Sequence, residues 1–128
     1  MERAIEWYLA VTLVIVGLSH VMRAEDWTEA YRQLGAMGHP GVFVNGGMSL
    51  VSGTVIIAGH GSWAWPGAIL TGFGWLLVGK GCLCFLAPHR AMRSMALASP
   101  KGFVIGGIVF IAMGGWACYC LWHHTQGR

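Results

Sequence analysis

Charged side chains are scarce in this sequence. Only 10% of the 128 residues are Asp, Glu, Lys or Arg, whereas 55% are hydrophobic. Soluble domains carry about 25% charged residues, so this chain lacks the side chains needed to cover a surface that faces water. Its basic residues occur singly or in scattered pairs, which excludes the basic patch typical of nucleic-acid binding. We expect a membrane protein whose partner is the lipid bilayer, with no nucleic-acid partner.

Two further absences narrow the class. The first apolar stretch is followed by Ser19 to Arg23 and not by the small residues of a signal-peptide cleavage site, so we expect that stretch to be retained as a helix. The long apolar stretches also show no alternation of polar and apolar residues, which excludes a transmembrane β-barrel.

Four apolar stretches are present, and each is long enough to cross a bilayer. They cover about residues 5–22, 41–58, 64–86 and 102–122. A helix of ~20 residues spans the ~30 Å hydrocarbon core, and only a helix satisfies its own backbone hydrogen bonds in lipid. The sequence therefore predicts one all-α membrane domain, residues 1–128, built as a four-transmembrane-helix bundle.

The link between the first and second spans predicts a short amphipathic helix in the interface. Asp26 and Glu29 resemble a capping box, and Gly35 or Gly38 with Pro40 would end the helix. A plain polar loop is the alternative. The apolar residues of this link recur at helical spacing: Trp27, Ala30, Tyr31, Leu34 and Met37. The second link, Gly59 to Ser62, is short enough to join spans two and three as a hairpin.

The distribution of basic residues predicts an orientation. Two basic residues, Arg3 and Arg128, lie on the side of the termini. The other side carries Arg23, Arg32, Arg90, Arg93 and Lys101 in the first and third links. By the positive-inside rule, these two links face the cytoplasm and both termini lie outside it. We expect a multi-pass protein of the bacterial inner membrane.

Lys80 is the most informative single residue. It lies about six residues inside the third span, roughly 9 Å from its cytoplasmic end. An ionisable residue at such depth is a functional candidate, with snorkelling to the interface or a structural polar pair as alternatives. Its side chain leans toward the N-terminus of its helix, hence toward the bilayer centre, and Gly79 and Gly81 leave room beside it.

Polar residues at a similar depth are the candidate partners of Lys80. Ser19 and His20 end the first span, and Asn45 lies one turn into the second. Together with Lys80 they are the predicted ligand-binding residues, and Glu25 and Asp26 follow nearby. If consecutive helices are neighbours, this group could hold an anionic head group, a quinone carbonyl or a proton.

Three further histidines and the four cysteines are expected to have no catalytic or metal-binding role. The histidines fall on the outer side and are interpreted as solvated interfacial residues, with metal binding as the alternative: His60, His123 and His124. The Cys82/Cys84 and Cys118/Cys120 pairs lie near opposite ends of their spans and are expected to fill space as small apolar residues. No cofactor is assigned.

The chain resembles the DoxX-like small four-helix bacterial membrane proteins. The resemblance covers roughly residues 10–85 and rests on Gly17-Leu18-Ser19-His20, on Trp27 and Leu34-Gly35, and on Ser49 to Gly53. That family often carries a lysine at the place of His20 and an acidic residue near Ser49. Since this chain has neither, the resemblance implies the fold and not the quinone-coupled sulfur oxidation linked to some members.

The sequence predicts a non-enzymatic inner-membrane protein. We expect an accessory subunit or a binding protein for a small lipid- or quinone-like ligand, assembled as a homo-oligomer or within a larger membrane complex. A small oligomeric transporter or channel, and a subunit of a redox membrane enzyme, are the alternatives. Close helix packing, within the bundle or between subunits, is predicted by Gly102-x-x-x-Gly106, Ser49-x-x-x-Gly53 and Ala68-x-x-x-Gly72.

Overall fold

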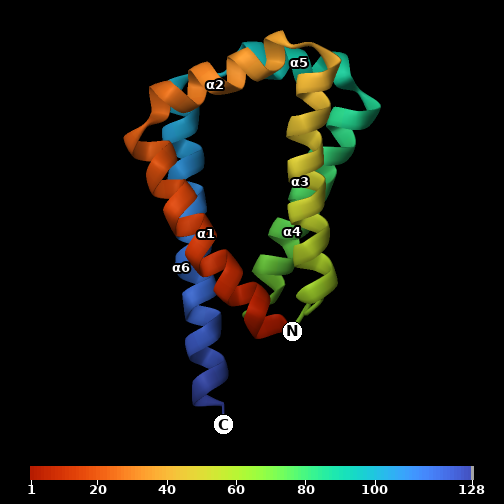
Figure 1. Cartoon of the computed structure of the whole chain (residues 1–128). Coiled ribbons are helices and arrows are strands. Elements are labelled where there is room, and N and C mark those ends of the chain that lie inside the picture. Colours follow the sequence, from red (N-terminus) through yellow and green to blue (C-terminus); the bar gives the residue numbers. More distant parts are fainter. Residues whose placement is uncertain (128) are drawn as a thin grey trace.

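The computed structural model describes residues 1–127, and these residues form six helices (Figure 1). Their bounds are α1 Glu2–Met22, α2 Ala24–Ala36, α3 His39–Gly59, α4 Ala68–Leu86, α5 Pro88–Ala96 and α6 Pro100–Gln126. Four of them, α1, α3, α4 and α6, are long and apolar enough to cross a membrane, which confirms the four expected spans. The third begins at Ala68 and not at residue 64, because residues 60–67 form the connection from α3.

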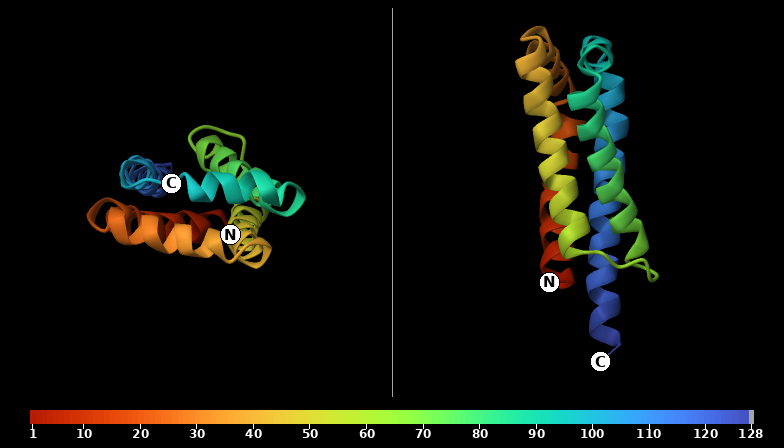
Figure 2. Two further views of the ribbon diagram at one scale, coloured as in Figure 1. Left: turned by 90° about the horizontal axis from the view of Figure 1, so that it is seen from above. Right: turned by 90° about the vertical axis from the view of Figure 1, so that its right-hand side faces the viewer.

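The long helices are arranged as two antiparallel pairs, α1 with α6 and α3 with α4 (Figures 1 and 2). The α3–α4 pair is the expected hairpin, whereas α1 packs against the last span and only lightly against α3. Glycines bring the backbones together in both pairs. A Cβ added to Gly107 would lie 2.7 Å from the carbonyl oxygen of Gly17, and one added to Gly53 would lie 2.7 Å from that of Gly74. Such contact allows the close helix approach that drives association in lipid.

Only one of the three expected small-residue motifs is used in this packing. Ser49 is buried and Gly53 contacts α4. A Cβ added to Gly72 or Gly106 would meet nothing within 4 Å, so these glycines lie on open faces. The glycines that pack are instead spaced two helical turns apart, as in Gly46 and Gly53 of α3, where each returns to the same face.

The first link forms the helix α2, which crosses the end of the molecule opposite the termini (Figure 1). The expected capping box is wrong: α2 begins at Ala24, before Asp26, and has no side-chain cap. Asp26 instead forms an ion pair with Arg23. Gly38 adopts a positive φ of 78°, which glycine tolerates without strain, and it precedes the start of α3.

A second short helix, α5, crosses the same end and was not predicted (Figure 1). Its first residue is Pro88, whose missing N–H costs nothing at a helix start. Ala91 and Met95 follow at a spacing of one turn, and both are buried. The third link is therefore a helix that packs against α2, α3 and α4.

The two halves of the chain have the same plan. Each consists of a long helix, a short helix and a second long helix, and the first long helix of each half packs against the last of the other. Arg23 is the single residue between α1 and α2, and Ala87 is the single residue between α4 and α5, so the two residues correspond. Each donates its backbone N–H to the carbonyl oxygen four residues earlier in the chain. Gly38 and Ser99 correspond as the residues that precede the last long helices. Counting along the helices from these two pairs of residues shows which residue of one half corresponds to which residue of the other.

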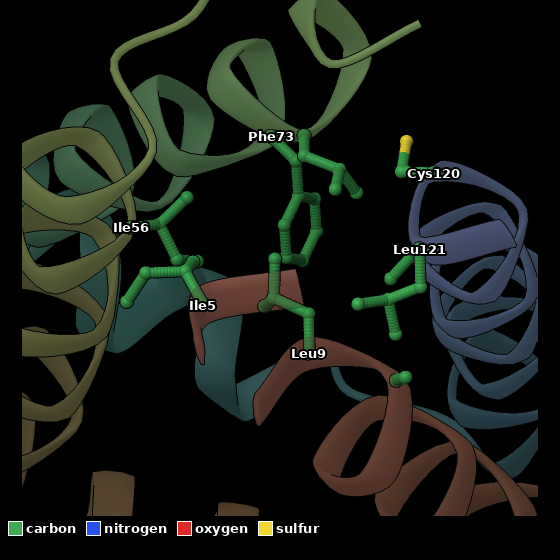
Figure 3. Close-up of a cluster of buried hydrophobic side chains, with 9 residues drawn as sticks. Ile5, Leu9, Ile56, Phe73, Cys120 and Leu121 are labelled. Carbon is green, nitrogen blue, oxygen red and sulfur yellow. The ribbon is translucent and has the colours of Figure 1, made fainter. Parts of the chain in front are cut away.

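The core is divided between the two ends of the molecule. Near the termini, side chains from all four long helices meet (Figure 3): Ile5, Leu9, Ala10, Ile56, Leu70, Phe73, Ala117, Cys120 and Leu121. At the other end, a smaller cluster beneath α2 and α5 contains Val42, Cys84, Ala91 and Met95. Each of these two apolar clusters has a group of polar side chains beside it.

Candidate functional site

The first polar group joins α2, α3 and α4 and contains two of the predicted site residues. The Lys80 ammonium lies 3.4 Å from Asn45 Oδ1. The side-chain amide of Asn45 donates to the Tyr31 hydroxyl over 3.2 Å, and the Lys80 ammonium lies 5.9 Å from the centre of the Tyr31 ring. Lys80 therefore contacts one of its candidate partners, Asn45, and Tyr31 belongs to the same polar group.

The surroundings of Lys80 differ from the expected ones. Lys80 is an exposed residue of α4, so its side chain lies at the rim of the bundle while its ammonium reaches Asn45. Gly81 does not shape this site, because a Cβ there would collide with Leu50 of α3. A Cβ on Gly79 would meet nothing within 4 Å. The space beside Lys80 is thus open on the Gly79 side and closed by helix packing on the other.

Tyr31 supplies a neutral hydroxyl to this group. Burial raises the pKa of its phenol, and the bond from Asn45 opposes that rise. The oxygen accepts from Asn45, which leaves its hydrogen free to be donated. Lys80 has three N–H donors and one protein acceptor at the limit of hydrogen-bond distance. The Lys80–Asn45–Tyr31 site therefore has more donors than acceptors.

Ser19 and His20 do not join this site, because α1 pairs with α6 and not with α4. The His20 ring stacks on Trp27 at 4.2 Å and contacts Phe103 of α6 at 5.3 Å. Its Nδ1 lies 2.7 Å from the carbonyl oxygen of Val16. The Ser19 hydroxyl accepts a bond from the Trp27 indole over 2.8 Å. Both residues fix the turn from α1 into α2, so the expected convergence of all four site residues is wrong.

The second polar group lies near the termini and centres on Glu6. This side chain is fully buried, and its Oε1 lies 3.2 Å from His60 Nε2 and 3.1 Å from His124 Nε2. Thr71 completes the group, with its hydroxyl 3.2 Å from His60 Nδ1. The other carboxyl oxygen, Oε2, is buried and has no hydrogen-bond partner among residues 1–127. The expectation that His60 is a solvated interfacial residue is wrong, since it is only 1% exposed.

The Glu6–His60 contact links the two helix pairs. Glu6 belongs to α1 and His124 to α6, whereas His60 follows α3 and Thr71 belongs to α4. Among residues 1–127, no group of three or more His, Cys, Asp or Glu has the arrangement needed to hold a metal ion. The geometry of this group is that of hydrogen bonds around one carboxyl.

The chain matches no family model, no curated protein and no solved structure. The interpretation of both polar groups therefore rests on their own geometry and chemistry.

The correspondence between the halves places apolar residues or glycine at the positions that match the two polar groups. Lys80 corresponds to Val16, and Asn45 corresponds to Gly106. At the other end, the positions that correspond to Glu6 and His60 hold the buried leucines Leu70 and Leu121. The same helix packing is thus built in one half with apolar residues at positions where the other half carries polar ones.

Sequence reasoning missed the Glu6 group, although a signal was present. Glu6 is not among the predicted site residues and lies at the start of the first predicted span, residues 5–22. It lies on the same helix face as Leu9, Ala10 and Leu13, at the spacing of the buried stripe. A carboxylate inside such a stripe needs buried partners, and His60 is the titratable residue nearest to the outer end of the hairpin.

Proposed function

We propose that this protein binds a small lipid-soluble ligand that presents carbonyl or anionic oxygen atoms to Lys80, Asn45 and Tyr31. The observation that carries the proposal is the donor excess of this site. Among the described residues, no carboxylate lies within ion-pair distance of the Lys80 ammonium. A cation at membrane depth is costly unless it is paired, and an oxygen-bearing ligand supplies the missing acceptor. A quinone and an anionic lipid share this chemistry.

The position of the site suits a ligand that arrives through the bilayer. Lys80 is exposed along the rim of α4, beside the open face of Gly79. The Tyr31 ring packs against the apolar cluster beneath α2 and α5, where a ligand head could stack on the ring or accept a bond from the hydroxyl. Charge-assisted hydrogen bonds contribute about 1.5–3 kcal/mol, so removing Lys80 is expected to weaken binding roughly 10- to 100-fold.

The test uses the two lysines of the chain as a matched pair. Purified protein with Lys80→Met is compared with Lys101→Met, which removes the same charge at the start of α6. Retained lipids and quinones are measured by native mass spectrometry, and affinities for a short-chain benzoquinone and for phosphatidylglycerol are titrated separately. We expect Lys80→Met alone to lose one of the two ligands. Equal retention in both variants would contradict the proposal.

We propose further that the protein lies in the inner membrane with α2 and α5 on the cytoplasmic side. The structure has both termini at the end opposite these two helices (Figure 1). The basic residues concentrate in α2, α5 and the segments beside them, which supports this orientation through the positive-inside rule. The exposed side of α2 would lie at the lipid–water interface as an amphipathic helix.

Self-association, or assembly into a larger complex as an accessory subunit, is part of the same proposal. Gly72 and Gly79 lie two turns apart on α4 and face open space. Such a face lets a second helix approach closely in lipid. Cysteine cross-linking at Leu76, which lies between them and is 74% exposed, should trap a dimer in native membranes if this face is used. The absence of any cross-linked product would reject this interface.

A further inference from the structure

Glu6 is a fully buried carboxyl that the proposed ligand site does not use. Its Oε1 contacts two imidazoles from different helix pairs, and its Oε2 has no hydrogen-bond partner in the described part of the chain. A buried carboxylate oxygen without a hydrogen-bond donor is costly, whereas the corresponding residue of the other half, Leu70, is buried without cost. The carboxyl therefore destabilises the folded chain at a position that an apolar residue fills well. We infer that it serves a function other than packing.

The hydrogen bonds of Thr71 determine where the protons of this group lie. The Thr71 hydroxyl is within 2.6 Å of the His60 carbonyl oxygen and 2.7 Å of the Ser62 carbonyl oxygen, so its single hydrogen is donated to a carbonyl. Toward His60 Nδ1 the hydroxyl oxygen can only accept, and Nδ1 must carry a hydrogen. A neutral imidazole has one N–H, so Nε2 would then point a lone pair at Glu6.

Two lone pairs facing each other across 3.2 Å do not form a hydrogen bond, so one more proton belongs to the His60–Glu6 contact. It lies either on Nε2, which gives an imidazolium beside a carboxylate, or on Glu6, which gives a carboxylic acid beside a neutral imidazole. Both arrangements have the same net charge. The pair is thus a place where one proton is held between two groups.

We propose that Glu6 and His60 form a proton-binding site that exchanges protons with water on the side of the termini, through His124. His124 contacts the same carboxyl oxygen and is 41% exposed. Together with His60 it lines a hollow of about 350 Å³ that also includes Ser62 and His123. Along α1, Glu6 lies between Ile5 and Leu9, two side chains of the apolar core (Figure 3). The site is therefore open to protons from one side only, and it stores a proton without conducting it across the membrane.

The titratable groups around this carboxyl come from three elements. They are Glu2 of α1, His60 after α3, and Cys120, His123 and His124 of α6, while α4 contributes only the hydroxyl of Thr71. Glu2, His123 and His124 are exposed, whereas Glu6, His60 and Cys120 are buried. Glu6 and His60 are thus the two buried groups in direct contact, and a proton bound there is held out of bulk water.

Infrared difference spectroscopy on the full chain in lipid nanodiscs tests the site. A step from about pH 8 to about pH 5, the range in which histidine changes its charge, should change the C=O stretch of a protonated carboxyl. Glu6→Gln should abolish that change, and Glu29→Gln, on the exposed face of α2, should retain it. A wild-type spectrum without this change, or the same change in Glu6→Gln, would overturn the proposal.

Two further measurements do not depend on the folding of a Glu6 variant. Nitrogen NMR of His60 in the wild-type chain should show Nδ1 protonated at both pH values, and an unprotonated Nδ1 would overturn the assignment. Transfer into D₂O should shift the carboxyl band. His124→Phe should slow that shift, whereas His89→Phe, in α5 at the opposite end of the molecule, should leave its rate unchanged. Equal exchange rates in both variants would reject the route through His124.

Discussion

Replacing Gly81 with alanine should loosen the α3–α4 pair, whereas the same change at Gly79 should not. A Cβ at Gly81 would lie 2.8 Å from Leu50 Cβ, and 2.9 Å from both Leu50 N and Gly46 O. Two of these three atoms are backbone, so no rotamer change can relieve the contact. The helices would have to separate by about half an ångström to reach ordinary van der Waals distance, 3.4 Å or more.

The magnitude follows from this separation. Overpacking at a close contact costs about 1–3 kcal/mol, and a gap of 0.5–1 Å along the rest of the interface forfeits a quarter to a half of each contact's attraction. Alanine gains about 0.5–1 kcal/mol over glycine inside a helix, and this gain applies to both variants. Gly81→Ala should therefore be less stable than Gly79→Ala by about 1–3 kcal/mol. That difference corresponds to roughly 5- to 150-fold in the folding equilibrium.

Reversible unfolding by sodium dodecyl sulfate in mixed micelles measures this difference through the fluorescence of the seven tryptophans. Gly79→Ala is the matched control, because Gly79 lies on the same helix as Gly81 and receives the same substitution. If the two alanine variants unfold at the same detergent fraction, backbone contact between α3 and α4 does not hold the pair together. Close backbone contact at glycines would then not stabilise either helix pair.

Three further predictions test other parts of the molecule. Gly107→Ala should destabilise the α1–α6 pair by about 1–3 kcal/mol relative to Gly106→Ala, measured in the same detergent titration, because only Gly107 touches the partner backbone. Replacing all four free cysteines with alanine should leave a folded protein, with losses of ~1–2 kcal/mol at most for each buried site in circular-dichroism melts. Reporter fusions should locate the C-terminus outside the cytoplasm, and a cytoplasmic signal would reject the orientation.

The four spans could be predicted because their information is local. A run of about 20 apolar residues defines a membrane helix by its length and composition alone. The bounds of α3, His39–Gly59, differ from the expected 41–58 by only a residue or two at each end. The short helix α5 was missed although Pro88, Ala91 and Met95 supply a start and a buried spacing, since a nine-residue helix stands out only when its packing partners are known.

The pairing of helices could not be predicted, because it depends on which glycine faces match across the sequence. Gly102 and Gly106 form the familiar motif on α6, yet Gly106 faces open space while Gly107 contacts Gly17. Nothing in either local sequence distinguishes these faces. The predicted ligand-binding group was partly wrong for the same reason. Lys80 and Asn45 are in contact because α3 and α4 form a hairpin, whereas His20 lies on α1, which pairs with α6.

The two polar groups share one property: their polar residues have no polar counterpart at the corresponding positions of the other half. Leu70 and Leu121 fill, without energetic cost, the positions that correspond to Glu6 and His60, so a leucine at position 6 should be accepted by the packing. It would be expected to remove the unpartnered carboxyl and to stabilise the fold, as apolar replacements of buried ionic groups often do, provided that His60 is replaced together with it. Since Glu6 and His60 stabilise the fold less than two leucines would, we infer that they serve a function other than stability. Proton binding at Glu6 and His60, and ligand binding at Lys80 and Asn45, are the roles that this chemistry supports.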